Sequence, residues 1–200
     1  MAAPKAKKAE QMIGINIPQI AIQHLKVKVV GDSPLITHAW NPKAIQQIKD
    51  KQGRKATTGK EARDPQADYE AAFYRTDDGK PAMRSIAFKD AMVSACRDAD
   101  YKMTEARGRF HVEGELVEII GEPRFREDMV RVGMGTADIR YRPEFVEWST
   151  TLPITYNSTR VSPEQIINLL NVAGFGVGVG EWRPEKNGQY GRFHVALENE

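Results

Sequence analysis

The chain has 200 residues, of which 40% are hydrophobic and 28% are charged, and its formal net charge is +2. This composition is typical of a globular protein and excludes a wholly disordered chain. Because the net charge is small, any attraction to the phosphates of a nucleic acid must come from cations that cluster locally. The one cysteine, Cys96, excludes an internal disulfide and a zinc site built from several cysteines.

The length fits one domain with additional segments. We predict a flexible basic tail over residues 1–18 and one α+β domain over residues 19–200. The first residues are basic, but the apolar segment of a secretory signal does not follow them, and no run approaches the ~18 apolar residues of a membrane span. We therefore expect the protein to be cytoplasmic.

Residues 41–82 show no regular hydrophobic period. From Lys43 to Asp64 there are seven basic and three acidic residues, which gives this stretch a local charge of +4. A stretch of this length without periodicity is usually functional or disordered. We predict a mobile basic insertion over about 43–82, with a short helix near 41–49.

The rest of the chain alternates between strand-like and helix-like patterns. In the first strand, Leu25, Val27 and Val29 alternate with Lys26 and Lys28, which is the period of a half-buried strand. The predicted elements are a strand over 20–30, a helix over 85–99, a strand over 107–120, a hairpin of 124–132 with 137–145, a strand over 146–156, a helix from 162 and a last strand over 190–197.

The last helix has the clearest start signal. Ser162 is the predicted N-cap, Pro163 follows it, and Gln165 completes a capping box. The order of strand, helix, two strands, helix and strand is that of a split βαβ sheet. We predict a ferredoxin-like, RNA-recognition-type antiparallel sheet with two helices, an extra hairpin and the long basic insertion.

Glycines occupy alternate positions 174, 176, 178 and 180 after this helix. A dinucleotide-binding loop needs Gly-x-Gly-x-x-Gly between a strand and a helix, and a P-loop needs Ser or Thr after its Gly-Lys pair. Neither pattern occurs, so we expect no nucleotide cofactor. Two interpretations remain open: a tight connection between the helix and the last strand, or a loop that packs against a phosphate backbone or a neighbouring subunit.

The segment from 174 to 193, Gly-Phe-Gly-Val-Gly-Val-Gly-Glu-Trp-Arg-Pro-Glu-Lys-Asn-Gly-Gln-Tyr-Gly-Arg-Phe, resembles the C-terminal glycine-rich loop of the RAMP superfamily. These are the repeat-associated proteins that build the RNA-binding backbone of CRISPR effector complexes. The resemblance implies a ferredoxin-like core, single-stranded nucleic acid as ligand, and oligomers or related subunits that assemble side by side. Residues 180–186 also resemble a segment of phage proteins, in which case the protein would act in the host cytoplasm.

Basic grooves with aromatic side chains hold single strands of nucleic acid, and the chain offers candidates for both. The alternative is that these charges lie on ordinary solvated faces and that the aromatic residues are core. The candidate nucleic-acid-binding residues are Lys26, Lys28, Lys49, Lys51, Arg54, Lys55, Arg109, Arg140, Arg142, Gly176, Gly178, Gly180, Trp182, Arg183, Tyr190 and Arg192.

Catalysis has weaker support. The four histidines lack metal-type spacing, and we expect no catalytic residue, metal or cofactor. His24, His111 and His194 each lie in a predicted strand and could meet across neighbouring strands. The leading hypothesis is a non-enzymatic single-strand nucleic-acid-binding protein, with RNA or DNA left open. The alternatives are a metal-independent, histidine-dependent endoribonuclease of the same superfamily, and a phage assembly or inhibitor protein that binds a protein partner.

Overall fold

The computed structural model describes residues 19–40, 42–53, 63–133 and 135–197. Its centre is a four-stranded sheet whose strand order is β10-β1-β9-β5, with every neighbouring pair antiparallel. The strands are β1 (Ile22–Gly31), β5 (Phe110–Val112), β9 (Ser149–Asn157) and β10 (Phe193–Val195), and the helices between them are α3 (Ser85–Ala95) and α5 (Pro163–Gly176). The strand–helix–strand–strand–helix–strand order and the sheet order are those of a ferredoxin-like core. The prediction of an antiparallel α+β fold is confirmed.

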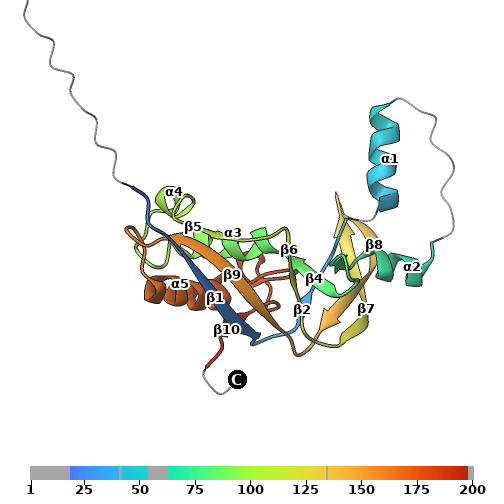
Figure 1. Cartoon of the computed structure of the whole chain (residues 1–200). Coiled ribbons are helices and arrows are strands. Elements are labelled where there is room, and N and C mark those ends of the chain that lie inside the picture. Colours follow the sequence, from blue (N-terminus) through green and yellow to red (C-terminus); the bar gives the residue numbers. More distant parts are fainter. Residues whose placement is uncertain (1–18, 41, 54–62, 134, 198–200) are drawn as a thin grey trace, which may run out of the picture.

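Helices α3 and α5 pack on one face of this sheet (Figure 1). The inward side chains of β9, among them Leu152 and Ile154, are almost completely buried, as are Phe88 of α3 and Leu170 of α5. Together they belong to one hydrophobic cluster. Because strand side chains alternate between faces, burying this face leaves the residues between them on the opposite face, which none of the described helices covers.

Helix α5 begins where the sequence predicts it. The Ser162 hydroxyl accepts a hydrogen bond from the Gln165 backbone N–H at 3.2 Å, and the Gln165 side chain accepts one from the Ser162 N–H at 2.9 Å. Pro163 occupies the first turn. This confirmed capping box satisfies backbone donors that the first turn leaves without partners.

A second, three-stranded sheet lies at the other end of the molecule (Figure 1). Its strand order is β2-β8-β7, with β2 (Leu35–Ile36), β7 (Pro123–Val132) and β8 (Thr136–Phe145), and the predicted hairpin is confirmed as β7–β8. Helix α2 (Pro65–Ala71) packs against β8, and Tyr69 contacts Phe125 with ring centroids 4.9 Å apart. Helix α1 (Pro42–Gln52) lies at the same end.

The predicted strand over 107–120 is wrong as one element. It divides into β5 and β6 (Leu116–Glu118), separated by a turn in which Gly114 has a φ of +80°. Strand β5 pairs with β9, whereas β6 pairs with β4 (Pro81–Arg84) in a third sheet of order β3-β4-β6, which also contains β3 (Tyr74–Arg75). One apolar run of the sequence therefore contributes a strand to each of two sheets, and the turn separates the two strands.

Several boundaries also differ from the predictions. The predicted strand over 146–156 begins only at Ser149, the last strand is confined to β10, and the helix predicted over 85–99 ends at Ala95. Short helical turns, α4 (Met103–Ala106) and η1 (Pro184–Lys186), complete the described elements. Within the described ranges, no helix is long and apolar enough to cross a membrane. The predicted tail over 1–18 lies outside the described residues, as does 54–62 of the insertion.

Cys96 follows α3 and is completely buried. Burial raises the pKa of its thiol above the ordinary value, because desolvation disfavours the thiolate. The side chain therefore acts as a small core residue. In the part of the chain that the structure describes, His, Cys, Asp and Glu residues form no group of three or more that could hold a metal ion.

Candidate nucleic-acid interface

The uncovered face of the four-stranded sheet carries basic and hydroxyl side chains. Lys26 and Lys28 on β1 are exposed and alternate with the buried Val27 and Val29. Each lies opposite a residue of β9, Lys26 facing Pro153 and Lys28 facing Thr151. The outward positions of the four strands are Ile22, His24, Lys26, Lys28, Val30, His111, Ser149, Thr151, Pro153, Thr155, Asn157 and His194. Among them none is acidic, and none is Phe, Tyr or Trp.

Two histidines flank one threonine on this face. Thr155 of β9 lies opposite His24 of β1 on one side and opposite His111 of β5 on the other. The His24 Nδ1 atom lies 2.9 Å from the Thr155 hydroxyl. Because neighbouring strands are ~4.8 Å apart, the two histidines are about 10 Å apart across the sheet. The expectation that these histidines meet across neighbouring strands is therefore wrong, because β9 separates His24 on β1 from His111 on β5, and His194 pairs with Asp32 at 2.7 Å.

His111 also contacts the helix side of the molecule. The Lys89 ammonium of α3 lies 3.0 Å from His111 Nδ1. Strand β5 is the edge of its sheet, so the Lys89 side chain reaches around that edge. This contact joins the uncovered sheet face to the surface of α3.

The glycine-rich segment after α5 packs against the protein itself. Gly178 and Gly180 have φ values of +69° and +78°, a region that favours glycine. A Cβ at Gly180 would lie 2.5 Å from the Ile36 carbonyl oxygen, and one at Gly178 would lie 2.7 Å from Pro184 Cδ. Gly176 is different, because its nearest neighbour would be Asp98 at 3.9 Å. Of the two open interpretations, this geometry supports the tight connection between the helix and the last strand.

The charged residues of this segment are largely paired. Arg183 contacts the Glu185 carboxylate at 2.8 Å and donates to the Gly180 carbonyl at 3.2 Å. The Ser94 hydroxyl donates to Glu185 at 3.3 Å, which attaches the loop to α3. Burial by itself would raise the pKa of Glu185, but the hydrogen bond and charge of Arg183 outweigh it and hold that pKa below its usual value. Glu185 is therefore ionised at neutral pH.

Glu181 joins the same loop to the hairpin. Its carboxylate lies 3.7 Å from His38 Nδ1 and 3.6 Å from Nη1 of Arg142, whose side chain is 3% exposed. The hydrogen bond from His38 is the main cause of a lowered pKa for Glu181, whereas burial lowers the pKa of Arg142. Neither Nε nor Nη1 of Arg142 has a hydrogen-bond partner. On the next strand, the Arg126 guanidinium lies over the Tyr190 ring at 4.9 Å.

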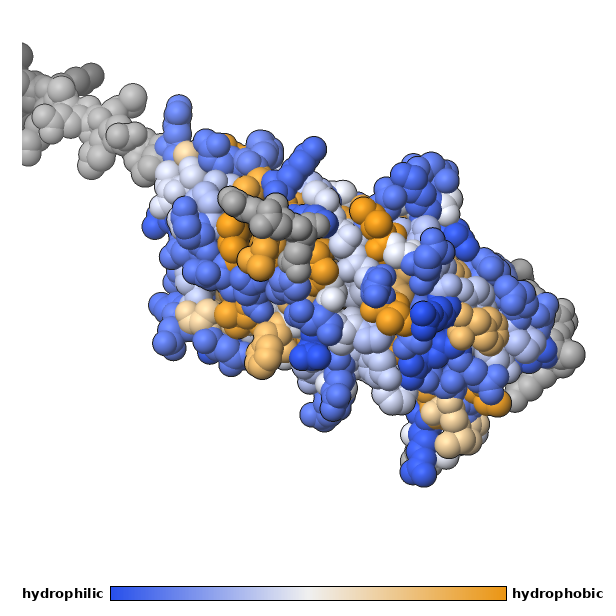
Figure 2. Space-filling model, turned by 90° about the horizontal axis from the view of Figure 1, so that it is seen from below, coloured by the Kyte–Doolittle hydropathy of each residue, from blue (hydrophilic) through white to orange (hydrophobic). Residues whose placement is uncertain are grey.

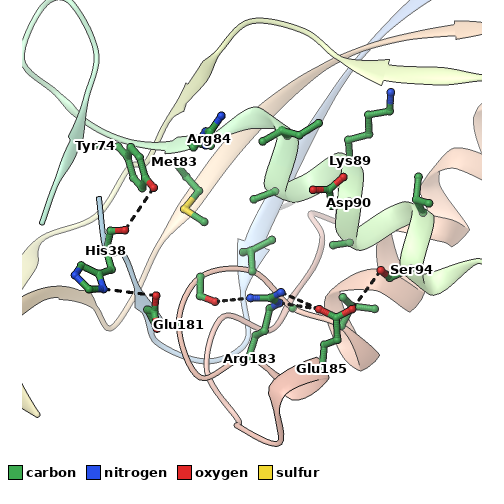
Figure 3. Close-up of a pocket in the computed structure, with 18 of the residues that line it drawn as sticks. His38, Tyr74, Met83, Arg84, Lys89, Asp90, Ser94, Glu181, Arg183 and Glu185 are labelled. Carbon is green, nitrogen blue, oxygen red and sulfur yellow. Dashed lines mark hydrogen bonds and ion pairs between the residues drawn. The ribbon is translucent and has the colours of Figure 1, made fainter. Parts of the chain in front are cut away.

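A cavity of about 750 Å³ lies between α3 and the glycine-rich loop (Figure 3). Arg84, Lys89 and Asp90 line it on the α3 side, with the Lys89 ammonium directed away from the loop, and Glu181, Arg183 and Glu185 line it on the loop side. The Tyr74 hydroxyl donates to the His38 carbonyl at 3.4 Å at one end. Apolar side chains, including Met83 and Val179, also line the cavity.

The remaining predicted residues lie on several surfaces. Arg109 is held by Tyr101 and Glu105, and Arg140 pairs with Asp138 at 2.9 Å. Lys49 is exposed on α1. Lys51 lies in α1, Arg54 and Lys55 fall outside the described residues, and Arg192 has a buried Nε without a hydrogen-bond partner. The structure therefore brings Lys26 and Lys28 together on one face, and of the other predicted cations it places Lys49, Arg109, Arg140, Arg142, Arg183 and Arg192 elsewhere.

Trp182 is 42% exposed and Trp40 is 70% exposed, whereas Trp148 is buried. Seen from below, hydrophilic residues cover most of the visible surface, and hydrophobic residues form separate groups (Figure 2). Sequence reasoning named Arg107 as a candidate cation but missed Arg84 and Lys89, and it did not place the three beside one cavity. Their spacing in the chain carries no signal, because α3, α4 and the third sheet bring them together.

No protein-family model matches the chain, and no curated protein is similar to it in sequence. Among solved structures, the fold is similar to the crystal structure of Cmr6 from Pyrococcus furiosus. The two chains share 10% sequence identity with a TM-score of 0.47, and the similarity covers 89% of this chain and 100% of that one.

Proposed function

We propose that this protein binds single-stranded nucleic acid without a catalytic step, using the uncovered face of its four-stranded sheet. The observation that carries the proposal is the charge of that face. Lys26, Lys28, His24 and His111 point outward from it, and no outward position of its described strands is acidic. Clustered cations attract the phosphates of a nucleic acid even when the net charge of the protein is small, and the carboxylate of Asp32, just beyond β1, is paired with His194.

The face contacts phosphates rather than bases in this proposal. Sheet surfaces that stack bases present aromatic side chains, and the outward positions here include no Phe, Tyr or Trp. Outward residues of one strand recur every ~6.6 Å, which lets Lys26 and Lys28 approach successive phosphates of an extended strand. Thr151 and Thr155 add hydroxyl groups beside them. Binding of this kind has little sequence preference.

The resemblance of residues 174–193 to the RAMP superfamily favours RNA as the ligand and side-by-side assembly with copies or related subunits, in the cytoplasm. The basic insertion extends the interface in this proposal, with Lys49 exposed on α1. Trp182 offers an exposed ring for one base at the rim of the glycine-rich loop.

The test is a binding titration of labelled single-stranded RNA, single-stranded DNA and duplexes at several salt concentrations. Each phosphate neutralised on a single strand contributes about −0.7 to the log–log slope, so the double variant K26A/K28A should flatten the slope by about 1.4. The control K102A/K186A removes the same charge from exposed residues elsewhere and should leave the slope near that of the wild type.

Two results would refute the proposal. One is wild-type protein that shows no salt-dependent binding to any single strand at micromolar concentration. The other is a K26A/K28A protein that behaves like K102A/K186A. A protein partner would then become the ligand of first choice.

The histidine pair supports RNA cleavage as a second candidate function. One imidazole of His24 and His111 would accept the proton of a 2′-hydroxyl, whose oxygen attacks the neighbouring phosphorus. The other would donate a proton to the departing 5′-oxygen, leaving a cyclic phosphate. Incubation with labelled single-stranded RNA and DNA tests this: cleavage of RNA only, lost in H24Q and in H111Q, would establish it. If the RNA stays intact, cleavage is refuted and the binding proposal is unaffected.

A further inference from the structure

We propose that the cavity between α3 and the glycine-rich loop holds one nucleotide, with its base inside and its phosphate at the α3 rim. This inference rests on the proposed function, because it takes the nucleotide to belong to the strand bound on the sheet face. A volume of about 750 Å³ lies within the ~300–1,000 Å³ of small-molecule sites. The ligand class follows from what lines the cavity and from what the cavity adjoins.

Each carboxylate on the loop side of the cavity is already paired with a basic side chain. Glu185 is paired with Arg183, and Glu181 is paired with His38 and the buried Arg142. Hydrogen bonds and charges from these partners hold the pKa of each carboxyl low, so both are anions matched by cations. Neither repels an anionic ligand as a lone carboxylate would.

The cations of the α3 side are not neutralised in this way. Arg84 and Arg107 form no ion pair among the described residues, and the nearest charged-group contact of Lys89 is the imidazole of His111. Against these three cations the α3 side of the cavity offers one carboxylate, that of Asp90. An anionic group is therefore favoured at this rim, and arginine is well suited to phosphate oxygens.

The interior suits an aromatic base. Met83, Met103, Val177 and Val179 supply apolar surface, and thioether groups pack well on aromatic rings. Ser94 lies on the cavity wall and can hydrogen-bond to the edge of a base. A cavity that combines apolar wall residues with cations on one rim matches a nucleotide better than it matches inorganic phosphate or an acidic peptide.

The cavity adjoins the proposed interface. Lys89 lines the cavity and touches His111, which points outward from β5 beside Thr155. Because β5 is the edge of the sheet, a nucleic-acid strand that crosses the uncovered face toward β5 needs to pass around only this one β-strand to reach the rim of the cavity. The Lys89–His111 contact marks the point of that turn.

The experiment measures binding of nucleoside monophosphates, the corresponding nucleosides and inorganic phosphate to the full chain by calorimetric titration. Wild-type protein should bind a monophosphate more tightly than either fragment. The variant R84A/R107A should lose about tenfold or more of that affinity, because charge-assisted hydrogen bonds are lost. The control R124A/R131A removes two exposed arginines of β7 and should bind as the wild type does.

These measurements test the nucleotide site in the cavity and the interface on the sheet face separately. K26A/K28A should keep its affinity for the monophosphate while losing affinity for single strands. If wild type binds no monophosphate at millimolar concentration, if inorganic phosphate binds as well as the nucleotide, or if R84A/R107A equals R124A/R131A, the nucleotide site is refuted. If the monophosphate binds as expected but replacing Lys26 and Lys28 does not change the affinity for single strands, the nucleotide site is supported and the proposed sheet interface is refuted.

Discussion

The guanidinium of Arg142, which is 3% exposed, faces the carboxylate of Glu181, with Nη1 and Oε2 3.6 Å apart. Arg142 belongs to the hairpin and Glu181 to the glycine-rich loop, so this pair joins the second sheet to the ferredoxin-like core. Removing one partner of a buried pair leaves an uncompensated charge, which costs more than the pair itself contributes. The relationship makes both residues structural, although Arg142 was predicted to contact nucleic acid.

Replacing Glu181 by Ala should lower the free energy of unfolding by about 1–3 kcal/mol, less than for a fully buried pair because Glu181 is 41% exposed. Adding Arg142→Met in the same chain should recover part of the loss, since no buried charge is then left alone. Urea unfolding of the two single variants and the double variant measures the coupling. Glu147→Ala, on an exposed carboxylate, is the control. Strict additivity of the two substitutions would contradict the pairing.

The same carboxylate should make stability depend on pH. The pKa of Glu181 in the folded protein lies below its ordinary value of 4.5, so the folded state favours the ionised form. Its contribution is then full above the unfolded pKa and is lost as pH falls through the folded pKa. The stability difference between wild type and E181Q should shrink as the pH falls below about 4.5. Parallel curves down to strongly acidic pH would contradict this direction.

Two glycines of α5 should respond in opposite ways to Ala. At Gly174 a Cβ would overlap the carbonyl oxygen of Phe193, so Gly174→Ala should push β10 away and cost about 2 kcal/mol or more. At Gly176 the nearest atom to a Cβ would be 3.9 Å away, so Gly176→Ala should be neutral or stabilise by up to ~1 kcal/mol. Thermal and urea unfolding of both variants test the contrast. Equal effects would show that β10 does not pack against α5 at Gly174 as described.

Trp182 should contribute to affinity for single strands without contributing to the salt slope. Its ring is 42% exposed, and base–aromatic stacking is worth roughly 1–3 kcal/mol per base and releases no counterions. Trp182→Ala should therefore weaken binding at every salt concentration by a similar factor, and Trp182→Phe should retain most of the affinity. A changed slope, or unchanged affinity in Trp182→Ala, would show that the ring does not touch a base.

Local patterns predicted those elements whose signals lie within a few residues. The capping box of Ser162 and Gln165 depends on neighbours three positions apart, and the alternation of Val27 and Val29 with Lys26 and Lys28 follows the pleat of one strand. The hairpin β7–β8 also pairs residues close in the chain. Each of these could be inferred from the sequence because no distant segment changes the outcome.

Tertiary structure decided which side chains come into contact. The run 107–120 divides because β9 pairs with its first part and β4 with its second, and both partners lie more than thirty residues away. Arg142 looks like a free cation in the sequence, but Glu181 pairs with it once the glycine-rich loop folds back. Lys89 reaches His111 only because β5 is a sheet edge. The sequence by itself determined the elements whose signals are local, since these follow from backbone periodicity and capping, whereas long-range packing divided the run 107–120 and decided which charges remain available to a ligand.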